Sequence, residues 1–95
     1  MIYKNVLNSP NIMKISFDNF KEVFCKSLSD TYSVNEVAED TKVFDLKVDS
    51  LDMMQIIFDI ESYFKIKIDD SIYNNLNSNT TLKDLYDFIL KFQMV

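Results

Sequence analysis

Residues 51–64, Leu-Asp-Met-Met-Gln-Ile-Ile-Phe-Asp-Ile-Glu-Ser-Tyr-Phe, constrain the fold more than any other segment. Their apolar side chains recur at helical spacing, which predicts a helix of about four turns, or roughly 22 Å. Met54 and Phe58 fall toward an adjacent side that we expect to stay partly exposed. The face expected in the core carries Ile57, Ile60 and Phe64, with Met53 and Ile56 nearby. A helix this apolar needs other elements to cover it, so the segment indicates a helical bundle.

Two further segments carry the stripe of an amphipathic helix. The first, at about 17–29, has its apolar residues at Phe17, Phe20, Phe24 and Leu28. The second, at about 82–92, has them at Leu82, Leu85, Phe88, Ile89 and Phe92. The candidate N-caps are Ser16 or Asp18 for the first of these helices, Asp49 for the helix over 51–64, and Thr80 or Thr81 for the last.

The segments between these helices have weaker signals. Residues 30–49 sustain no helical period, and we expect a long ordered loop pinned to the core by Val34, Val37, Val43, Phe44 and Leu46. Residues 64–68 alternate like a short strand, but without a pairing candidate we expect an extended connector. A short helix at 71–76 follows. The prediction is an all-α fold, a small four-helix bundle of three main helices and one short helix.

The chain of 95 residues suits one compact domain. Residues 1–14 are mixed in character and hold the only proline, so we expect an N-terminal extension followed by a domain over 15–95. No stretch approaches the ~18 consecutive apolar residues of a membrane span, and the first residues lack the pattern of a secretion signal. We therefore expect a cytoplasmic protein without a membrane span.

Composition argues against several classes of function. Glycine and histidine are absent, so the chain has no glycine-rich phosphate loop, no Cys/His metal cluster and no histidine-activated nucleophile. Arginine is also absent and the net charge is −5, which argues against nucleic-acid binding and favours partners with basic surfaces. Cys25, the only cysteine, is expected to be a half-buried small residue. Asp69 and Asp70 are expected to cap the short helix and not to bind a metal.

Ser50 is the candidate site for chemistry. It follows the long loop and begins the apolar helix, so its hydroxyl is expected beside unpaired amide groups and the positive end of the helix dipole. A phosphodiester would be tolerated at such a position. Spacing alone favours a simpler interpretation, in which Ser50 or Asp49 is the N-cap of the helix.

A wider pattern surrounds this serine. The tripeptide at 49–51, Asp-Ser-Leu, is preceded by Phe-Asp-Leu at 44–46 and followed by the apolar helix. Residues 66–70, Ile-Lys-Ile-Asp-Asp, and 81–89, Thr-Leu-Lys-Asp-Leu-Tyr-Asp-Phe-Ile, extend the pattern. In this order of helices and motifs, residues 17–92 resemble the acyl carrier protein family.

The resemblance implies that Ser50 receives 4′-phosphopantetheine from coenzyme A through a phosphopantetheinyl transferase, and that the thiol of this arm carries acyl groups as thioesters. The chain would then be a carrier and not an enzyme. It would be a monomer served by an acyl-loading ligase or acyltransferase and by downstream acyl-processing enzymes, as in fatty acid biosynthesis and lipid metabolism. Two alternatives remain open. One is an aminoacyl or peptidyl carrier that uses the same serine, and the other is a helical interaction module with Ser50 as a helix cap.

The resemblance also implies two sets of binding residues. Partner enzymes would contact Asp49, Leu51, Asp52, Met54, Phe58, Asp59 and Glu61. An acyl chain would lie among Ile56, Ile60, Phe64, Ile68, Ile72 and Leu76. These last side chains are bulky enough to fill the same space, so the sequence leaves the choice between an open pocket and a packed core undecided.

The chain departs from the family pattern in two places. Lys47 stands where the family usually has glycine, so a positive φ at this position would cost about 1 kcal/mol. Gln55, Ser62 and Tyr63 stand on the apolar helix where acids are common, which thins its acidic face. We hypothesise a specialised carrier that serves its own dedicated enzymes.

Overall fold

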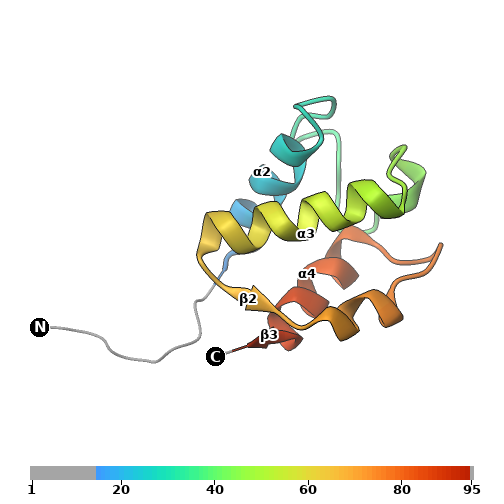
Figure 1. The fold of residues 1–95 in the computed structure, drawn as a ribbon. Coiled ribbons are helices and arrows are strands. Elements are labelled where there is room, and N and C mark those ends of the chain that lie inside the picture. The colour runs from blue at the N-terminus through green and yellow to red at the C-terminus, as the bar shows by residue number, and fades with distance from the viewer. Residues whose placement is uncertain (1–14, 95) are drawn as a thin grey trace, which may run out of the picture.

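The computed structural model describes residues 15–94, and the N-terminal extension predicted for residues 1–14 lies outside them. Most of the described chain is helical (Figure 1). The helices are α2 (Phe17–Ser27), α3 (Ser50–Phe64) and α4 (Leu82–Lys91), with the short 3-10 helices η1 (Val43–Asp45) and η2 (Asp70–Asn75). Two short strands are present, β2 (Lys67–Ile68) and β3 (Gln93–Met94). The predicted all-α bundle of three main helices and one short helix is confirmed, with η2 as the short helix.

A single hydrophobic cluster forms the core. Helix α2 packs against both α3 and α4, while η2 packs against α4. Ile56 and Ile60 of α3 are fully buried in this cluster, together with Phe24 of α2 and Ile89 of α4. The predicted core face of α3 is confirmed, since its buried residues are Met53, Ile56, Ile57, Ile60 and Phe64. Apolar burial of this kind is the main driving force for folding, and here it fixes the orientation of α3.

Helix α2 ends earlier than the periodicity predicts. Its last residue is Ser27, whereas the apolar stripe predicts a helix as far as residue 29. Ser29 and Asp30 adopt left-handed backbone conformations, with φ of 56° and 57°. A right-handed helix cannot continue through such residues, so the chain leaves the helix axis after Leu28.

The connector after α3 is a paired strand, and the prediction that it has no partner is wrong. Strand β2 pairs with β3 in antiparallel register, with Lys67 opposite Met94 and Ile68 opposite Gln93. The partner comes from the end of the chain, because α4 ends at Lys91 and not at the predicted residue 92. The N–H of Asp69 then donates to the carbonyl of Phe92 at 2.9 Å. The end of the chain therefore holds the segment between α3 and η2.

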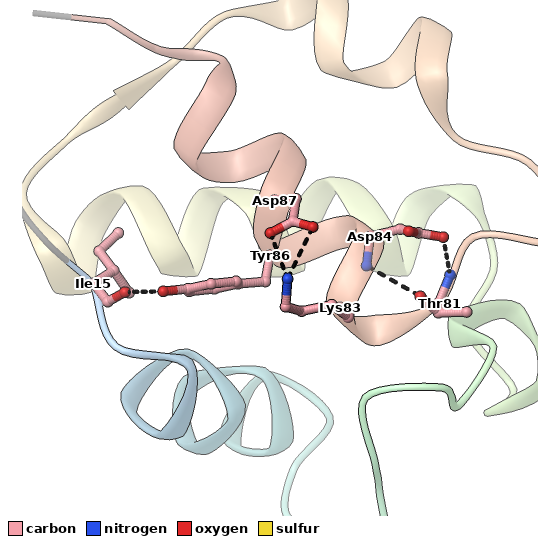
Figure 2. A network of polar contacts seen from close by, with 6 residues as sticks. All are labelled: Ile15, Thr81, Lys83, Asp84, Tyr86 and Asp87. Carbon is pink, nitrogen blue, oxygen red and sulfur yellow. Dashed lines mark hydrogen bonds and ion pairs between the residues drawn. The ribbon is translucent and has the colours of Figure 1, made fainter.

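Helix α4 is fixed at its start and tied to the start of the described chain (Figure 2). Of the two predicted caps, Thr81 is the N-cap, and it forms a capping box with Asp84 in which both bonds are 3.1 Å. The Tyr86 hydroxyl donates to the carbonyl of Ile15. Helix α2 begins directly after this contact, with Ser16 as its N-cap. Two segments far apart in sequence are thereby joined.

The long loop between α2 and α3 is ordered, as predicted. Val37 and Val43 are buried, with 2% and 0% of their surface exposed. The loop is also joined to the start of α4, because Val43 N–H donates to the Thr80 carbonyl at 3.0 Å and Leu82 N–H donates to the Thr41 carbonyl at 2.8 Å. These bonds fix the position from which residues 44–49 approach α3.

Lys47 adopts the left-handed conformation that the departure from the family pattern suggested, with φ of 59°. Four residues of the described chain have a positive φ, and because the chain has no glycine they are Ser29, Asp30, Lys47 and Lys65. A side chain with a Cβ atom is strained in this region. The approach to α3 therefore stores backbone strain at Lys47.

We predict that Lys47→Gly raises the free energy of unfolding by about 0.5–1 kcal/mol, because glycine adopts a positive φ without steric strain. Lys42→Gly is the matched control, since Lys42 is also an exposed lysine of this loop but has an ordinary φ of −77°. There the substitution should lower stability, because it only adds freedom to the unfolded chain. Urea unfolding measures both, and a loss of stability in Lys47→Gly would contradict the assignment of strain.

Candidate functional site

The N-terminus of α3 is closed by a pair of carboxylates. The side chain of Asp49 accepts from the N–H of Asp52 at 2.8 Å, and the side chain of Asp52 accepts from the N–H of Asp49 at 3.1 Å. Asp49 is thus the N-cap and Ser50 is the first residue of the helix. Ser50 is exposed to solvent, and the cap is a neighbouring carboxylate. The prediction that Asp49 caps this helix is therefore confirmed, and the alternative that Ser50 is the cap is wrong.

The setting of the Ser50 hydroxyl suits a covalently attached phosphate. The first turn of a helix presents amide groups without intrahelical partners, and the dipole of α3 makes this end positive. An anionic phosphodiester is stabilised in such a place. Because the hydroxyl is exposed and not used as the cap, it can carry a phosphodiester without breaking the structure of α3.

A groove of about 570 Å³ opens beside Ser50. Its lining is mainly apolar and comes from η1, α3 and η2, with Leu76 directly after η2: Phe44, Ser50, Met53, Met54, Asp70, Tyr73 and Leu76. Burial raises the pKa of the Tyr73 phenol, and the nearby carboxylates of Asp70 and Glu61 raise it further. The phenol is therefore protonated at neutral pH.

The structure separates the residues predicted to surround an acyl chain. Ile56, Ile60 and Ile72 are fully buried in the core, and Phe64 and Ile68 are only 7% and 5% exposed. Of the predicted set, Leu76 is the member that lines the groove beside Ser50.

Sequence reasoning missed two of the groove residues on η2. Asp70, Tyr73 and Leu76 lie three positions apart. In a 3-10 helix, side chains three positions apart lie one above the other, so Asp70 and Tyr73 share one face of η2, and Leu76 follows directly after the helix. A three-residue period at 70–76 was the signal that could have identified this wall.

The apolar residues predicted to contact partners lie on the surface of α3. Leu51 is 75% exposed, Met54 55% and Phe58 60%. They follow Ser50 along the same helix. The structure therefore brings them together with the candidate attachment point.

The acids predicted to contact partners have structural roles within the chain. Asp49 and Asp52 form the capping box of α3. Asp59 accepts from the Ser27 hydroxyl at 2.7 Å and from the Gln55 amide at 2.8 Å, and the first of these bonds joins α3 to α2. The remaining acid is Glu61, which accepts from the N–H of Ile68 at 2.8 Å.

Two other residues considered in the sequence analysis, Cys25 and Asp69, contribute to the fold and not to the groove beside Ser50. Cys25 is only 3% exposed, deeper than expected, and burial raises the pKa of its thiol although Lys21 opposes the shift. Asp69 is the N-cap of η2 and accepts from the N–H of Ser71 at 2.9 Å, as the capping prediction requires. This hydrogen bond lowers the pKa of the Asp69 carboxyl. Among residues 15–94, no three potential metal ligands are grouped closely enough to hold an ion.

Comparison with known proteins identifies the family of this chain. The family model described as "Phosphopantetheine attachment site" matches residues 20–89. The acyl carrier protein of Cyanophora paradoxa is 39% identical over 72 residues, which is 75% of this chain and 65% of the length of that protein. The acyl carrier proteins of Thermotoga maritima and a Sulfurovum species are 35% and 38% identical, and the alignments cover 75% and 77% of this chain and 91% and 92% of those proteins.

The fold and the site define a small helical carrier domain of the phosphopantetheine-dependent class. The chain belongs to the acyl carrier protein family. Membership of this family implies covalently attached 4′-phosphopantetheine and a carrier that is not itself an enzyme. None of the helices in the described part has the length and apolar character needed to cross a membrane.

We predict that Asp49→Ala lowers the free energy of unfolding by about 1 kcal/mol, because it removes the N-cap of α3. Ser50→Ala should change it by less than about 0.5 kcal/mol, because the exposed hydroxyl is not the cap. Urea unfolding of the two variants and the unsubstituted protein gives the comparison. An equal loss in both variants would mean that Ser50 shares the capping role.

Proposed function

We propose that Ser50 is the attachment point of the phosphopantetheine arm and that the protein carries acyl groups as thioesters on this arm. The observation that carries the proposal is that Asp49 caps α3, while Ser50, the first residue of the helix, is exposed. The family match over residues 20–89 includes this position. A groove beside the serine offers room for part of the arm or for its cargo.

The delivery of acyl groups requires separate enzymes. A phosphopantetheinyl transferase adds the arm, a ligase or acyltransferase loads it, and acyl-processing enzymes act on the thioester, as in fatty acid biosynthesis. Tethering suits a small shuttle, because it raises the effective concentration of the thioester at each enzyme. An aminoacyl or peptidyl cargo would use the same serine and the same arm.

The intact mass of the protein tests the attachment point. We predict that incubation with coenzyme A and a broad-specificity phosphopantetheinyl transferase adds the mass of one phosphopantetheine group to the unsubstituted protein, and adds nothing to Ser50→Ala.

The chain offers a matched control for this experiment. Like Ser50, Ser71 follows an aspartate and precedes a branched apolar residue at the start of a helix. Its hydroxyl, however, donates to the Asp69 carboxylate at 3.0 Å. Ser71→Ala should therefore gain the same mass as the unsubstituted protein. A gain that survives Ser50→Ala, or no gain with several transferases, would contradict the proposal.

We further propose a specialised carrier that works with dedicated enzymes. Gln55, Ser62 and Tyr63 leave α3 with few acids on its surface, and Asp59 is held by hydrogen bonds within the chain. Charge complementarity largely sets association rates and partner choice, so enzymes that recognise a strongly acidic helix should accept this one poorly.

A general bacterial fatty-acid synthase provides the test of this specialisation. We predict that its kcat/KM with the holo form of this protein is at least about tenfold below the value with its own carrier, which corresponds to about 1.4 kcal/mol. Equal values for the two carriers would show that the protein serves general fatty acid synthesis.

A further inference from the structure

The groove beside Ser50 borders the hydrophobic core along two side chains. Met53 of α3 lines the groove and is only 1% exposed, and Tyr73 of η2 lines the groove, is half-buried and packs against the core. Ile56 follows Met53 by three residues on the same face of α3, and Ile72 precedes Tyr73. Both isoleucines are fully buried. Met53 and Tyr73 therefore stand between the groove and the core.

These two side chains differ in how readily they can move. Methionine is unbranched and flexible, so Met53 can adapt its shape to a neighbouring apolar chain. The ring of Tyr73 is rigid and carries a hydroxyl. Turning the ring into the core would place this hydroxyl in apolar surroundings, where a polar group without a partner is unfavourable. Turning the ring outward would give up its apolar contact with the core. Tyr73 is therefore the fixed part of the boundary.

This boundary limits how far an acyl chain can extend from Ser50 into the fold. A short acyl group finds room in the groove, which has a volume of about 570 Å³. The tail of a longer group would have to displace Tyr73 to reach Ile56 and Ile60, which are closely packed in the core and have no exposed surface. The ring of Tyr73 thus separates the space that is open to cargo from the space that the fold has filled.

We propose that Tyr73 determines the length of the acyl group that this carrier shelters. A short-chain acyl group lies in the groove, whereas the tail of a long-chain group remains in water. This inference rests on the proposed attachment at Ser50. Removal of the ring would extend the groove toward the core, and an apolar cavity of this kind accepts apolar ligands.

The test compares a butyryl and a decanoyl form of the protein. A broad-specificity phosphopantetheinyl transferase makes each form by transferring the acylated arm from butyryl-coenzyme A or decanoyl-coenzyme A to the apo protein. A chain that is sheltered only in the folded state raises the equilibrium constant between folded and unfolded protein, which urea unfolding measures. In the unsubstituted protein this constant should differ by less than about threefold between the two forms. In Tyr73→Ala it should be at least about tenfold larger for the decanoyl form, which corresponds to about 1.4 kcal/mol.

Two further variants separate the barrier from a general role in stability. Tyr73→Phe keeps the ring, so its two forms should differ as little as those of the unsubstituted protein. Tyr32→Ala is the matched control, because Tyr32 is also half-buried and packs against the core but lines a different hollow, with Leu28 and Leu46. The loss of its ring should destabilise both forms equally, and the decanoyl chain should not restore stability.

The backbone amide signals of Ile56 and Ile60 in NMR spectra report where the chain lies. Decanoyl in place of butyryl should shift them in Tyr73→Ala and leave them in place in the unsubstituted protein.

The outcomes separate this inference from the proposed function. No mass gain in the unsubstituted protein would overturn the attachment at Ser50 and the inference with it. Decanoyl-induced shifts of the Ile56 and Ile60 signals in the unsubstituted protein would overturn the inference alone, and this measurement needs no variant. A folded Tyr73→Ala variant that gains nothing from the decanoyl chain would also overturn it. If Tyr73→Ala does not fold, Tyr73→Leu, which removes less volume, takes its place under the same criteria.

Discussion

The capping box between Asp49 and Asp52 is the interaction on which the site depends. Two short side chain to backbone bonds close the N-terminus of α3. Because a carboxylate is the cap, the adjacent Ser50 begins the helix with its side chain at the surface, at the positive end of the helix dipole. Contacts outside α3 also position the capping box. The bond from Val43 N–H to the Thr80 carbonyl joins the loop that precedes the box to the start of α4.

Helix α3 combines two roles on opposite faces. One face buries Ile56 and Ile60 in the core, and the other exposes Leu51 and Phe58 to solvent. The acids of this helix are used mainly to hold the fold together, as Asp59 does by accepting a bond from α2. Internal hydrogen bonds thus hold α3 against its neighbours, while Leu51 and Phe58 remain exposed on its surface.

The helical period of the sequence was sufficient to locate the three main helices and the buried face of α3, because burial along a helix follows its own repeat. Whether Ser50 is the cap was open, since the answer depends on which of two neighbouring oxygens meets a backbone N–H. Residues 64–68 show the alternation of a strand, but the β2–β3 pair was missed because its other strand, Gln93–Met94, is too short to show a period. The hydrogen bond by which Asp59 joins α3 to α2 could not be predicted, because its partner Ser27 is 32 positions away in the sequence. Tyr73 was missed because side chains of a 3-10 helix repeat every three residues, which differs from the α-helical repeat that located the other helices.

The most direct test of the central claim is the position of the arm in the holo protein. Tryptic digestion releases residues 48–65 as one peptide, because lysines precede and end this segment, and places Ser71 in another peptide. Fragmentation mass spectrometry of the peptides then assigns the phosphopantetheine group to a single residue. The account predicts that the group is on Ser50, and a group on Ser62, on Ser71 or on any other residue would contradict it.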